Sequence, residues 1–261
     1  MEERAADIHD IERHHDVAEE VAARSDTGEP DQQAVCQGRT DPEAAAPVRQ
    51  HNETQAAVLD YLSALPPLPA DPFLLETILS GLPAGSRAAQ AAVDIALHDL
   101  VGKELGLPLY RLFGLDPSRA PQTSFTIGLG SIAEVQAKAC SAAGHFSILK
   151  LKFDGDADHC LATARAVRAV TEARLVADAN CAWTVEQALR LLPALAQIGL
   201  EWIEQPLPEA DLEGLQRIHH ASPVPIFADE PVRTARDIPP LAGCVDGVNI
   251  KVMKAGGLRE A

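Results

Sequence analysis

A regular alternation of short β-prone runs with helix-like stretches constrains this chain more than any other feature. Six β-prone runs follow Thr123, and segments with helical periodicity, such as 159–170 and 184–199, separate them. Strand followed by helix, repeated, predicts parallel strands, because parallel neighbours need a long crossover connection. The β-prone runs lie at 124–129, 147–153, 173–180, 200–206, 225–230 and 248–252.

The spacing of these runs indicates which parallel fold they form. Charged residues near the run ends follow one another at intervals of 22 to 26 residues: Lys152, Asp178, Glu204, Asp229 and Lys251. One β/α unit of a TIM-type barrel takes about 30 residues, so we predict an incomplete (β/α) barrel with about six strands. A doubly wound open sheet is the alternative, but it favours a glycine-rich loop after its first strand, and GLGS at 128–131 is too short a match.

The part of the chain before the repeat reads as helical from about residue 53 to 114. Ser86 is placed to cap a helix that Gly106 and Pro108 end. His98 lies beside the apolar stripe of this helix, and we expect it to be a structural histidine. The stripe comprises Ala89, Val93, Ala96, Leu97, Leu100 and Val101.

Residues 1–42 differ from the rest, with few large apolar side chains, and we expect a polar, disordered segment. His9, His14 and His15 could bind a metal, but a solvated tail is the simpler interpretation.

The composition excludes some classes of binding partner and indicates a cellular compartment. The net charge is −16, from 38 acidic and 22 basic residues, which argues against nucleic acid or an anionic membrane as partner. No apolar run reaches the 18 or so residues of a membrane span, and the first residues do not form a secretory signal. The five cysteines are dispersed without a CxxC pair, as in proteins with reduced thiols. We therefore predict a cytoplasmic protein.

Charged side chains at the ends of five successive runs point to a single site. The carboxyl ends of barrel strands open onto one face, and a charge within an apolar strand costs several kcal/mol unless it is paired or bound to a metal. Asp178, Glu204 and Asp229 come from three consecutive runs. Oxygen ligands without Cys or His suit Mg²⁺. Three separate salt bridges are the alternative.

Lysines flank these carboxylates in the sequence order. Lys150 and Lys152 alternate along one run, so they share a face, and their mutual repulsion favours a neutral amine. Lys251 enters from the far side of the three carboxylates. Two lysines on opposite sides of a substrate suit removal of a proton from one face and its return to the other. We expect Lys254 to be an ordinary exposed lysine.

The motifs themselves resemble a known family. KLK at 150–152, DAN at 178–180, EQP at 204–206, ADE at 228–230 and NIKVMKAGG at 249–257 resemble the signature series of the enolase superfamily, muconate-lactonising subgroup. Segments 93–114 and 123–129 make the chain most similar to the dipeptide (L-Ala-D/L-Glu) epimerases. The resemblance implies a partial N-terminal α+β capping domain over 43–120 and a partial TIM-type barrel over 121–261.

The resemblance also implies roles for individual residues. Lys152 and Lys251 would be the two acid/base groups, and the three carboxylates would hold Mg²⁺. Lys150 would lower the proton affinity of Lys152 and contact the substrate carboxylate, and Thr126 would line the pocket. A lysine at position 251 speaks against the mandelate racemase branch, which uses a His–Asp pair.

The implied activity is epimerisation at the α-carbon next to a carboxylate of a dipeptide, through an enediolate. A muconate-type cycloisomerase or an o-succinylbenzoate synthase would share the same lysine pair, and a non-catalytic fragment is the third alternative. Each of these enzymes would bind a small-molecule substrate, and we expect neither nucleic acid nor a membrane as partner. The sequence leaves open whether the chain forms a homo-oligomer.

Two departures from the family shape our expectations for this chain. The likeness is lost abruptly before residue 43, which suggests a shifted reading frame or a misassigned start. Six strands are visible where a closed barrel has eight. We expect the strands near Thr123 and Lys251 to present open edges, and the chain as given to be poorly soluble or inactive.

Overall fold

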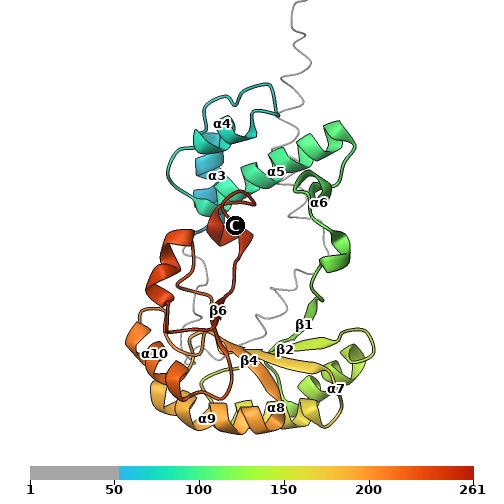
Figure 1. Ribbon diagram of the computed structural model, residues 1–261, viewed down its shortest axis with the longest axis vertical. Coiled ribbons are helices and arrows are strands. Elements are labelled where there is room, and N and C mark those ends of the chain that lie inside the picture. Colours follow the sequence, from blue (N-terminus) through green and yellow to red (C-terminus); the bar gives the residue numbers. More distant parts are fainter. Residues whose placement is uncertain (1–52) are drawn as a thin grey trace, which may run out of the picture.

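The computed structural model describes residues 53–261 (Figure 1). The polar segment 1–42, with His9, His14 and His15, lies outside the described residues. A helical part lies at one end of the molecule, and a sheet backed by helices lies at the other (Figure 1). None of the described helices is long and apolar enough to cross a membrane.

The sheet has six strands in the order β1-β2-β3-β4-β5-β6, and each neighbouring pair is parallel. This confirms the predicted repeat and the α/β barrel architecture. Within the described residues, β1 and β6 each pair with one neighbour. The strands are β1 (Ser124–Ile127), β2 (Ile148–Lys152), β3 (Arg174–Asp178), β4 (Leu200–Glu204), β5 (Ile226–Ala228) and β6 (Gly247–Val248).

The end of the last strand differs from the prediction. We expected a strand through residue 252, but β6 ends at Val248 and helix α11 (Val252–Ala255) begins directly after Lys251. Directly after the strand, the Asn249 N–H donates to Ala228 O at 2.7 Å. Lys251 therefore lies at a helix start and not within a strand.

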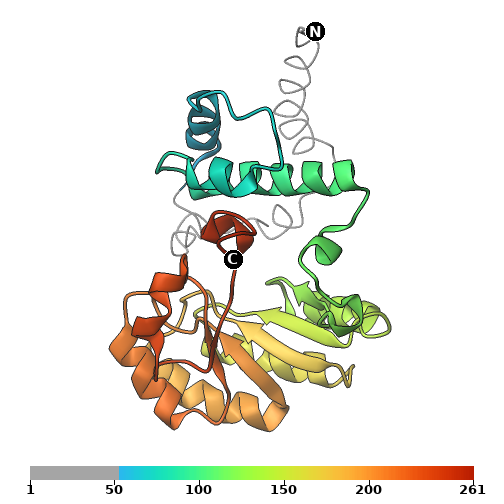
Figure 2. The ribbon, with the colours of Figure 1, turned by 45° about the horizontal axis from the view of Figure 1, so that its top comes forward.

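Four helices cover one face of the sheet (Figures 1 and 2). They are α7 (Ile132–Ala142), α8 (Ala157–Arg168), α9 (Val185–Ile198) and α10 (Leu212–Ala221). Each begins at a residue whose side chain accepts a backbone N–H of the first turn, namely Ser131, Asp156, Thr184 and Asp211. The described residues also contain three short 3-10 helices: η1 (Pro117–Arg119), η2 (Ala235–Asp237) and η3 (Pro239–Leu241).

Alternation along the strands separates the core from the site. Leu149 and Leu151 of β2 are buried in the core between sheet and helices. Lys150 and Lys152 of the same strand are only partly buried and lie on the opposite face. The sheet therefore has one apolar face under the helices and one face that carries charged residues.

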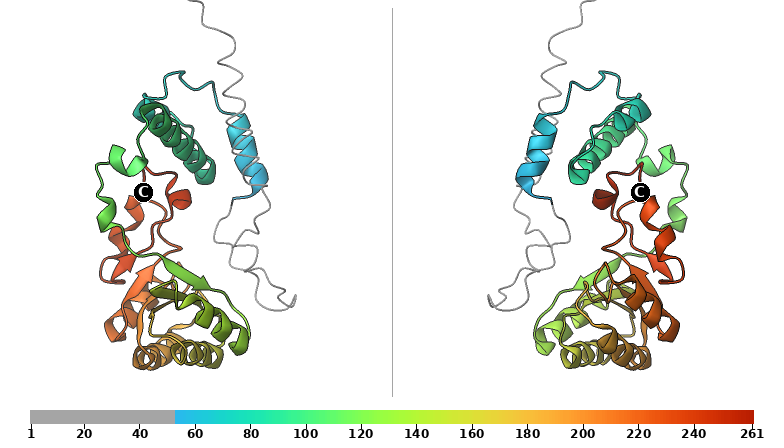
Figure 3. Two further views of the ribbon diagram at one scale, coloured as in Figure 1. Left: turned by 90° about the vertical axis from the view of Figure 1, so that its right-hand side faces the viewer. Right: turned by 90° about the vertical axis from the view of Figure 1, so that its left-hand side faces the viewer.

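The N-terminal helices lie beyond that second face (Figures 1 and 3). They are α3 (Gln55–Ser63), α4 (Leu75–Ser80), α5 (Arg87–Leu105) and α6 (Leu109–Leu112). The predicted boundaries of α5 are confirmed: the Ser86 side chain accepts the Ala89 N–H, and Gly106 ends the helix with a φ of 64°. The division into domains at residue 121 stays a prediction.

The buried face of α5 is more polar than the predicted apolar stripe. Val93, Leu97 and Leu100 are half-buried, whereas Asp94 and His98 are buried. His98 is a structural histidine, as predicted: its Nδ1 lies 2.9 Å from Asp94 O, and its ring packs against Phe113 with centroids 5.5 Å apart. Ala89 and Val101 of the predicted stripe are buried, but Asp94 and His98 share the buried face because part of this helix faces the C-terminal segment, which presents backbone N–H groups.

Candidate active site

Three carboxylates lie at the carboxyl ends of neighbouring strands. Asp178 ends β3 and is in register with Glu204, which ends β4, and Asp229 follows β5 directly. Their relative exposures are 1 %, 1 % and 0 %. Burial this complete requires compensation by opposite charge or hydrogen bonds, and lysines on both sides provide it.

Lys150 bridges the first two carboxylates. Its Nζ lies 2.6 Å from Glu204 Oε2 and 3.1 Å from Asp178 Oδ2. Burial disfavours the charged ammonium, but Asp178 and Glu204 outweigh it and hold the pKa of Lys150 above its ordinary value. The expectation that Lys150 lowers the proton affinity of Lys152 stays a prediction.

Lys152 contacts the outer side of the same cluster. Its Nζ donates to Asp178 Oδ2 at 2.7 Å and to Asn180 Oδ1 at 2.8 Å. Burial disfavours ionisation of Asp178, but Lys150 and Lys152 outweigh it, so the pKa of Asp178 lies below its ordinary value. Asn180 has a positive φ of 43°, which belongs to the turn that brings its amide toward Lys152.

Two lysines share the third carboxylate. Lys251 Nζ lies 2.5 Å from Asp229 Oδ2, and Lys254 Nζ lies 2.5 Å from both Asp229 Oδ1 and Asp229 O. Burial disfavours ionisation of Asp229, but hydrogen bonds from the two lysines hold its pKa below the ordinary value. The prediction of an exposed Lys254 is wrong, since its side chain is only 5 % exposed.

Glu204 occupies the middle of the row. Burial and the negative charge of Asp178 raise its pKa, although Lys150 opposes this shift. The Asn249 amide donates to Glu204 Oε1 at 2.7 Å. Glu204 is thus the carboxylate of the three whose ionised form is least favoured.

Glu230 adds a fourth buried carboxylate. Burial and the neighbouring Asp229 raise its pKa. Its Oε1 accepts from Asn180 Nδ2 at 3.3 Å, whereas Oε2 is buried without a hydrogen-bond partner in the described part of the chain. An orphaned buried carboxylate oxygen beside three others is what a site for a cation or its water ligands provides.

The chemistry of the candidate ligands fits Mg²⁺, but their present contacts are with lysines. All candidate ligands are oxygens, as a hard cation prefers. Within residues 53–261, however, no group of three or more His, Cys, Asp or Glu side chains is placed to hold a metal as it stands. Lysine ammonium groups occupy the carboxylate oxygens instead, so cation binding requires some of these contacts to open.

Thr126 lies in register with Lys150 on the neighbouring strand β1, and its side chain is exposed. It is therefore on the same edge of the site as the first lysine pair. Its contact with substrate stays a prediction.

Sequence reasoning gave no role to Asn180, Asn249 or Lys254. Asn249 lies two residues before Lys251 in the predicted strand, and this spacing alone would have placed both side chains on the same face. Lys254 is one helical turn beyond Lys251, and taking this segment as a strand concealed that relation.

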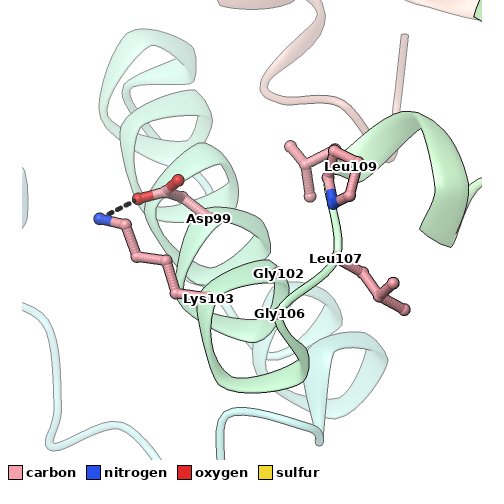
Figure 4. A pocket seen from close by; sticks show the side chains of 7 residues that line it. Asp99, Gly102, Lys103, Gly106, Leu107 and Leu109 are labelled. Carbon is pink, nitrogen blue, oxygen red and sulfur yellow. Dashed lines mark ion pairs between the residues drawn. The ribbon is translucent and has the colours of Figure 1, made fainter.

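A separate pocket lies at the C-terminal end of α5 (Figure 4). Its volume is about 260 Å³, and its lining includes Leu107, Leu109 and the exposed pair of Asp99 and Lys103, 2.8 Å apart. None of the predicted site residues lines it.

Comparison with known proteins agrees with this geometry. Residues 132–261 match the family description "Enolase C-terminal domain-like", and residues 48–114 match "Mandelate racemase / muconate lactonizing enzyme, N-terminal domain". The L-Ala-D/L-Glu epimerase of Bacteroides thetaiotaomicron is 44% identical over 196 residues, which are 74% of this chain and 51% of that protein.

Solved structures give the same result. The dipeptide epimerase of Enterococcus faecalis V583, complexed with Mg and L-Leu-L-Tyr, has a TM-score of 0.72 at 35% identity, covering 80% of this chain and 61% of that one. Muconate cycloisomerase of Pseudomonas fluorescens has a TM-score of 0.75 at 28% identity, covering 83% and 63%.

The chain spans about half the length of the Bacteroides epimerase that it matches. Matches to both domains of one family, together with a parallel α/β sheet that carries its charged residues at one end, lead to one conclusion. The chain belongs to the mandelate racemase/muconate lactonizing enzyme family of the enolase superfamily, whose relatives are isomerases.

Proposed function

We propose that this chain carries the catalytic centre of a Mg²⁺-dependent epimerase that inverts the α-carbon next to a carboxylate in a dipeptide such as L-Ala-D/L-Glu. The observation that carries the proposal is the position of two lysines. Lys152 at the end of β2 and Lys251 after β6 lie on opposite sides of the buried carboxylate row on β3, β4 and β5. The 44% identity to an L-Ala-D/L-Glu epimerase supports the dipeptide as substrate.

Asp178, Glu204 and Asp229 would hold the Mg²⁺ ion, which when bound stabilises the negative charge of the deprotonated substrate. Release of the Lys152 contact with Asp178 and of the Lys251 contact with Asp229 would free both the carboxylates and the amines. The same rearrangement therefore prepares the ligands and the two acid/base groups.

The chemistry of the chain's own residues is proton transfer. One of Lys152 and Lys251, as the neutral amine, takes the α-proton on one face of the substrate. The other, as the ammonium, delivers a proton to the opposite face, which inverts the centre. Lys150 stays charged beside Asp178 and Glu204, so it is suited to pair with the substrate carboxylate and to disfavour a second ammonium at Lys152.

The test uses L-Ala-L-Glu and L-Ala-D-Glu with the full chain in deuterated water and Mg²⁺, followed by NMR of the α-proton. We expect Lys152→Ala and Lys251→Ala each to abolish epimerisation, while one of them retains deuterium exchange for one diastereomer. Lys103→Ala, in an exposed pair on α5, is the matched control and should behave as the wild type. Near-normal epimerisation by both site variants would exclude the two-base mechanism.

A muconate-type cycloisomerase is the second candidate, favoured by the TM-score of 0.75 to such an enzyme. Incubation with cis,cis-muconate, followed by its ultraviolet absorbance, distinguishes the two activities. Mg²⁺ binding without turnover of either substrate would instead identify a binding protein or a non-catalytic portion of an enzyme. The cytoplasmic location stays a prediction from the sequence.

A further inference from the structure

Helix α11 connects the carboxylate row to the N-terminal helices. The helix has only four residues, a single turn, and it contacts α5 (Figures 1 and 2). Lys251 and Lys254, at its start and in its turn, hold the same carboxylate, Asp229. One turn is too short to be rigid by itself. Its position, and that of both lysines, must therefore come from the groups that pack against it.

Asp94 provides one of these contacts. This α5 residue is only 2 % exposed. Its Oδ1 accepts the Leu258 N–H at 2.7 Å, and its Oδ2 accepts the Arg259 N–H at 3.3 Å. A buried carboxylate that accepts backbone N–H groups 164 and 165 residues away holds that segment in place.

Gly257 shows how closely the two segments approach. Its φ is +133°, and an added Cβ atom would lie 2.3 Å from the Asp94 carboxyl carbon. A side chain at this position is excluded both by its backbone conformation and by Asp94. The glycine is therefore required for the carboxylate to reach the backbone.

A second contact acts on the same turn. Arg87, the first residue of α5, donates from Nη1 to Ala255 O at 2.9 Å. Ala255 directly follows Lys254, so α5 holds the chain both one residue and four residues beyond this lysine.

We infer that Asp94 is a positioning residue for the cluster of Lys251, Asp229 and Lys254. By fixing the backbone after α11, it keeps Lys254 on Oδ1 and the backbone oxygen of Asp229, and Lys251 on Oδ2 of the same residue. The N-terminal helix α5 thus acts on the geometry of one acid/base lysine and one cation ligand through the backbone that follows α11. The chemical purpose of the cluster rests on the proposed function, whereas the positioning itself is measurable without substrate or metal.

Lysine acetylation of the metal-free full chain, read for each residue by mass spectrometry, measures the positioning. Lys254 should be protected in the wild type. Asp94→Ala removes both acceptors and should raise the labelling rate of Lys254 about tenfold, as expected for loss of a buried charge-assisted hydrogen bond. Asp94→Asn keeps the stronger acceptor for Leu258 and should raise the rate by less than about threefold.

Asp99→Ala is the matched control, since Asp99 lies on the same helix and, among residues 53–261, forms its ion pair with the exposed Lys103. It should leave Lys254 protected. Circular dichroism establishes that each variant is folded. If Asp94→Ala does not fold, Arg87→Met tests the same segment through the contact with Ala255, and it should also expose Lys254.

Titration with Mn²⁺, followed by electron paramagnetic resonance, separates this inference from the proposed function. We expect Asp94→Ala to weaken Mn²⁺ binding about tenfold and Asp94→Asn to weaken it much less. Both variants lose the charge of Asp94, so a difference between them reports the hydrogen bond to the backbone and not the charge. A wild-type chain that binds no Mn²⁺ would remove the metal part of the proposed function, while the labelling result would still decide the positioning role. A folded Asp94→Ala or Arg87→Met variant in which Lys254 stays protected would overturn the inference.

Discussion

Replacement of Lys254 by methionine should destabilise the folded chain strongly, although the residue lies in a short surface-connected helix. The side chain is 5 % exposed and donates to Asp229 O and to Asp229 Oδ1, both at 2.5 Å. Loss of two hydrogen bonds from a charged donor corresponds to about 3–6 kcal/mol. Lys251 still pairs with Asp229 Oδ2, so we expect a loss of about 3 kcal/mol, the lower end for breaking a buried pair.

Urea unfolding at pH 7, followed by tryptophan fluorescence, measures this loss. Lys103→Met is the control, because its pair with Asp99 is exposed on both sides and should contribute less than about 0.5 kcal/mol. The double variant Lys254→Met with Asp229→Asn should cost less than the sum of the single variants by about 2 kcal/mol, since the two residues interact directly. A loss below about 1 kcal/mol for Lys254→Met, with no coupling to Asp229, would refute the buried pair.

Three further predictions follow from other contacts. The pKa of Asp178 is lowered, so its ionised form stabilises the fold above its unfolded pKa of about 3.9, and this contribution is lost as the pH falls below that value. As the pH is lowered from about 5 to about 2, the unfolding free energy should therefore decrease more steeply for the wild type than for Asp178→Asn. Gly247→Ala places a Cβ atom 2.4 Å from the Phe227 ring, and overpacking of this kind should cost about 1–3 kcal/mol in urea unfolding. Burial raises the pKa of Cys160 to about 12, so a disulfide reagent at pH 8 should modify the exposed Cys140 long before Cys160 in the folded chain, as peptide mapping will show.

The repeating part of the fold could be predicted from the sequence because two independent signals mark most of the strands. The β-prone run gives the position of a strand, and in five of the six runs a charged residue near the end gives its direction toward the site. The prediction was wrong at β6, where the β-prone run continues to residue 252 but the paired strand ends at Val248. Local propensity does not indicate where pairing with a neighbouring strand stops.

The site was predictable as a set of residue types and not as a set of contacts. The strand-end positions of Asp178 and Glu204 follow from the repeat, and their shared register confirms the expected neighbourhood. The pairing of Lys150 with both carboxylates depends on side chains from three different strands. The polar face of α5 escaped prediction for the same reason, since Asp94 is explained only by backbone amides distant in sequence.

The charge balance of the site bears on how cation and substrate binding are linked. Four lysines face four buried carboxylates at the strand ends: Lys150, Lys152, Lys251, Lys254, Asp178, Glu204, Asp229 and Glu230. The cluster is thus near neutrality with its lysines charged, and a divalent cation adds two positive charges in a region of low dielectric. Loss of the proton from one catalytic lysine removes one of these charges, and a substrate carboxylate offsets the other. Under the proposed function, the cation and an anionic substrate therefore favour each other's binding, and the cation also favours the neutral amine that the first proton transfer requires.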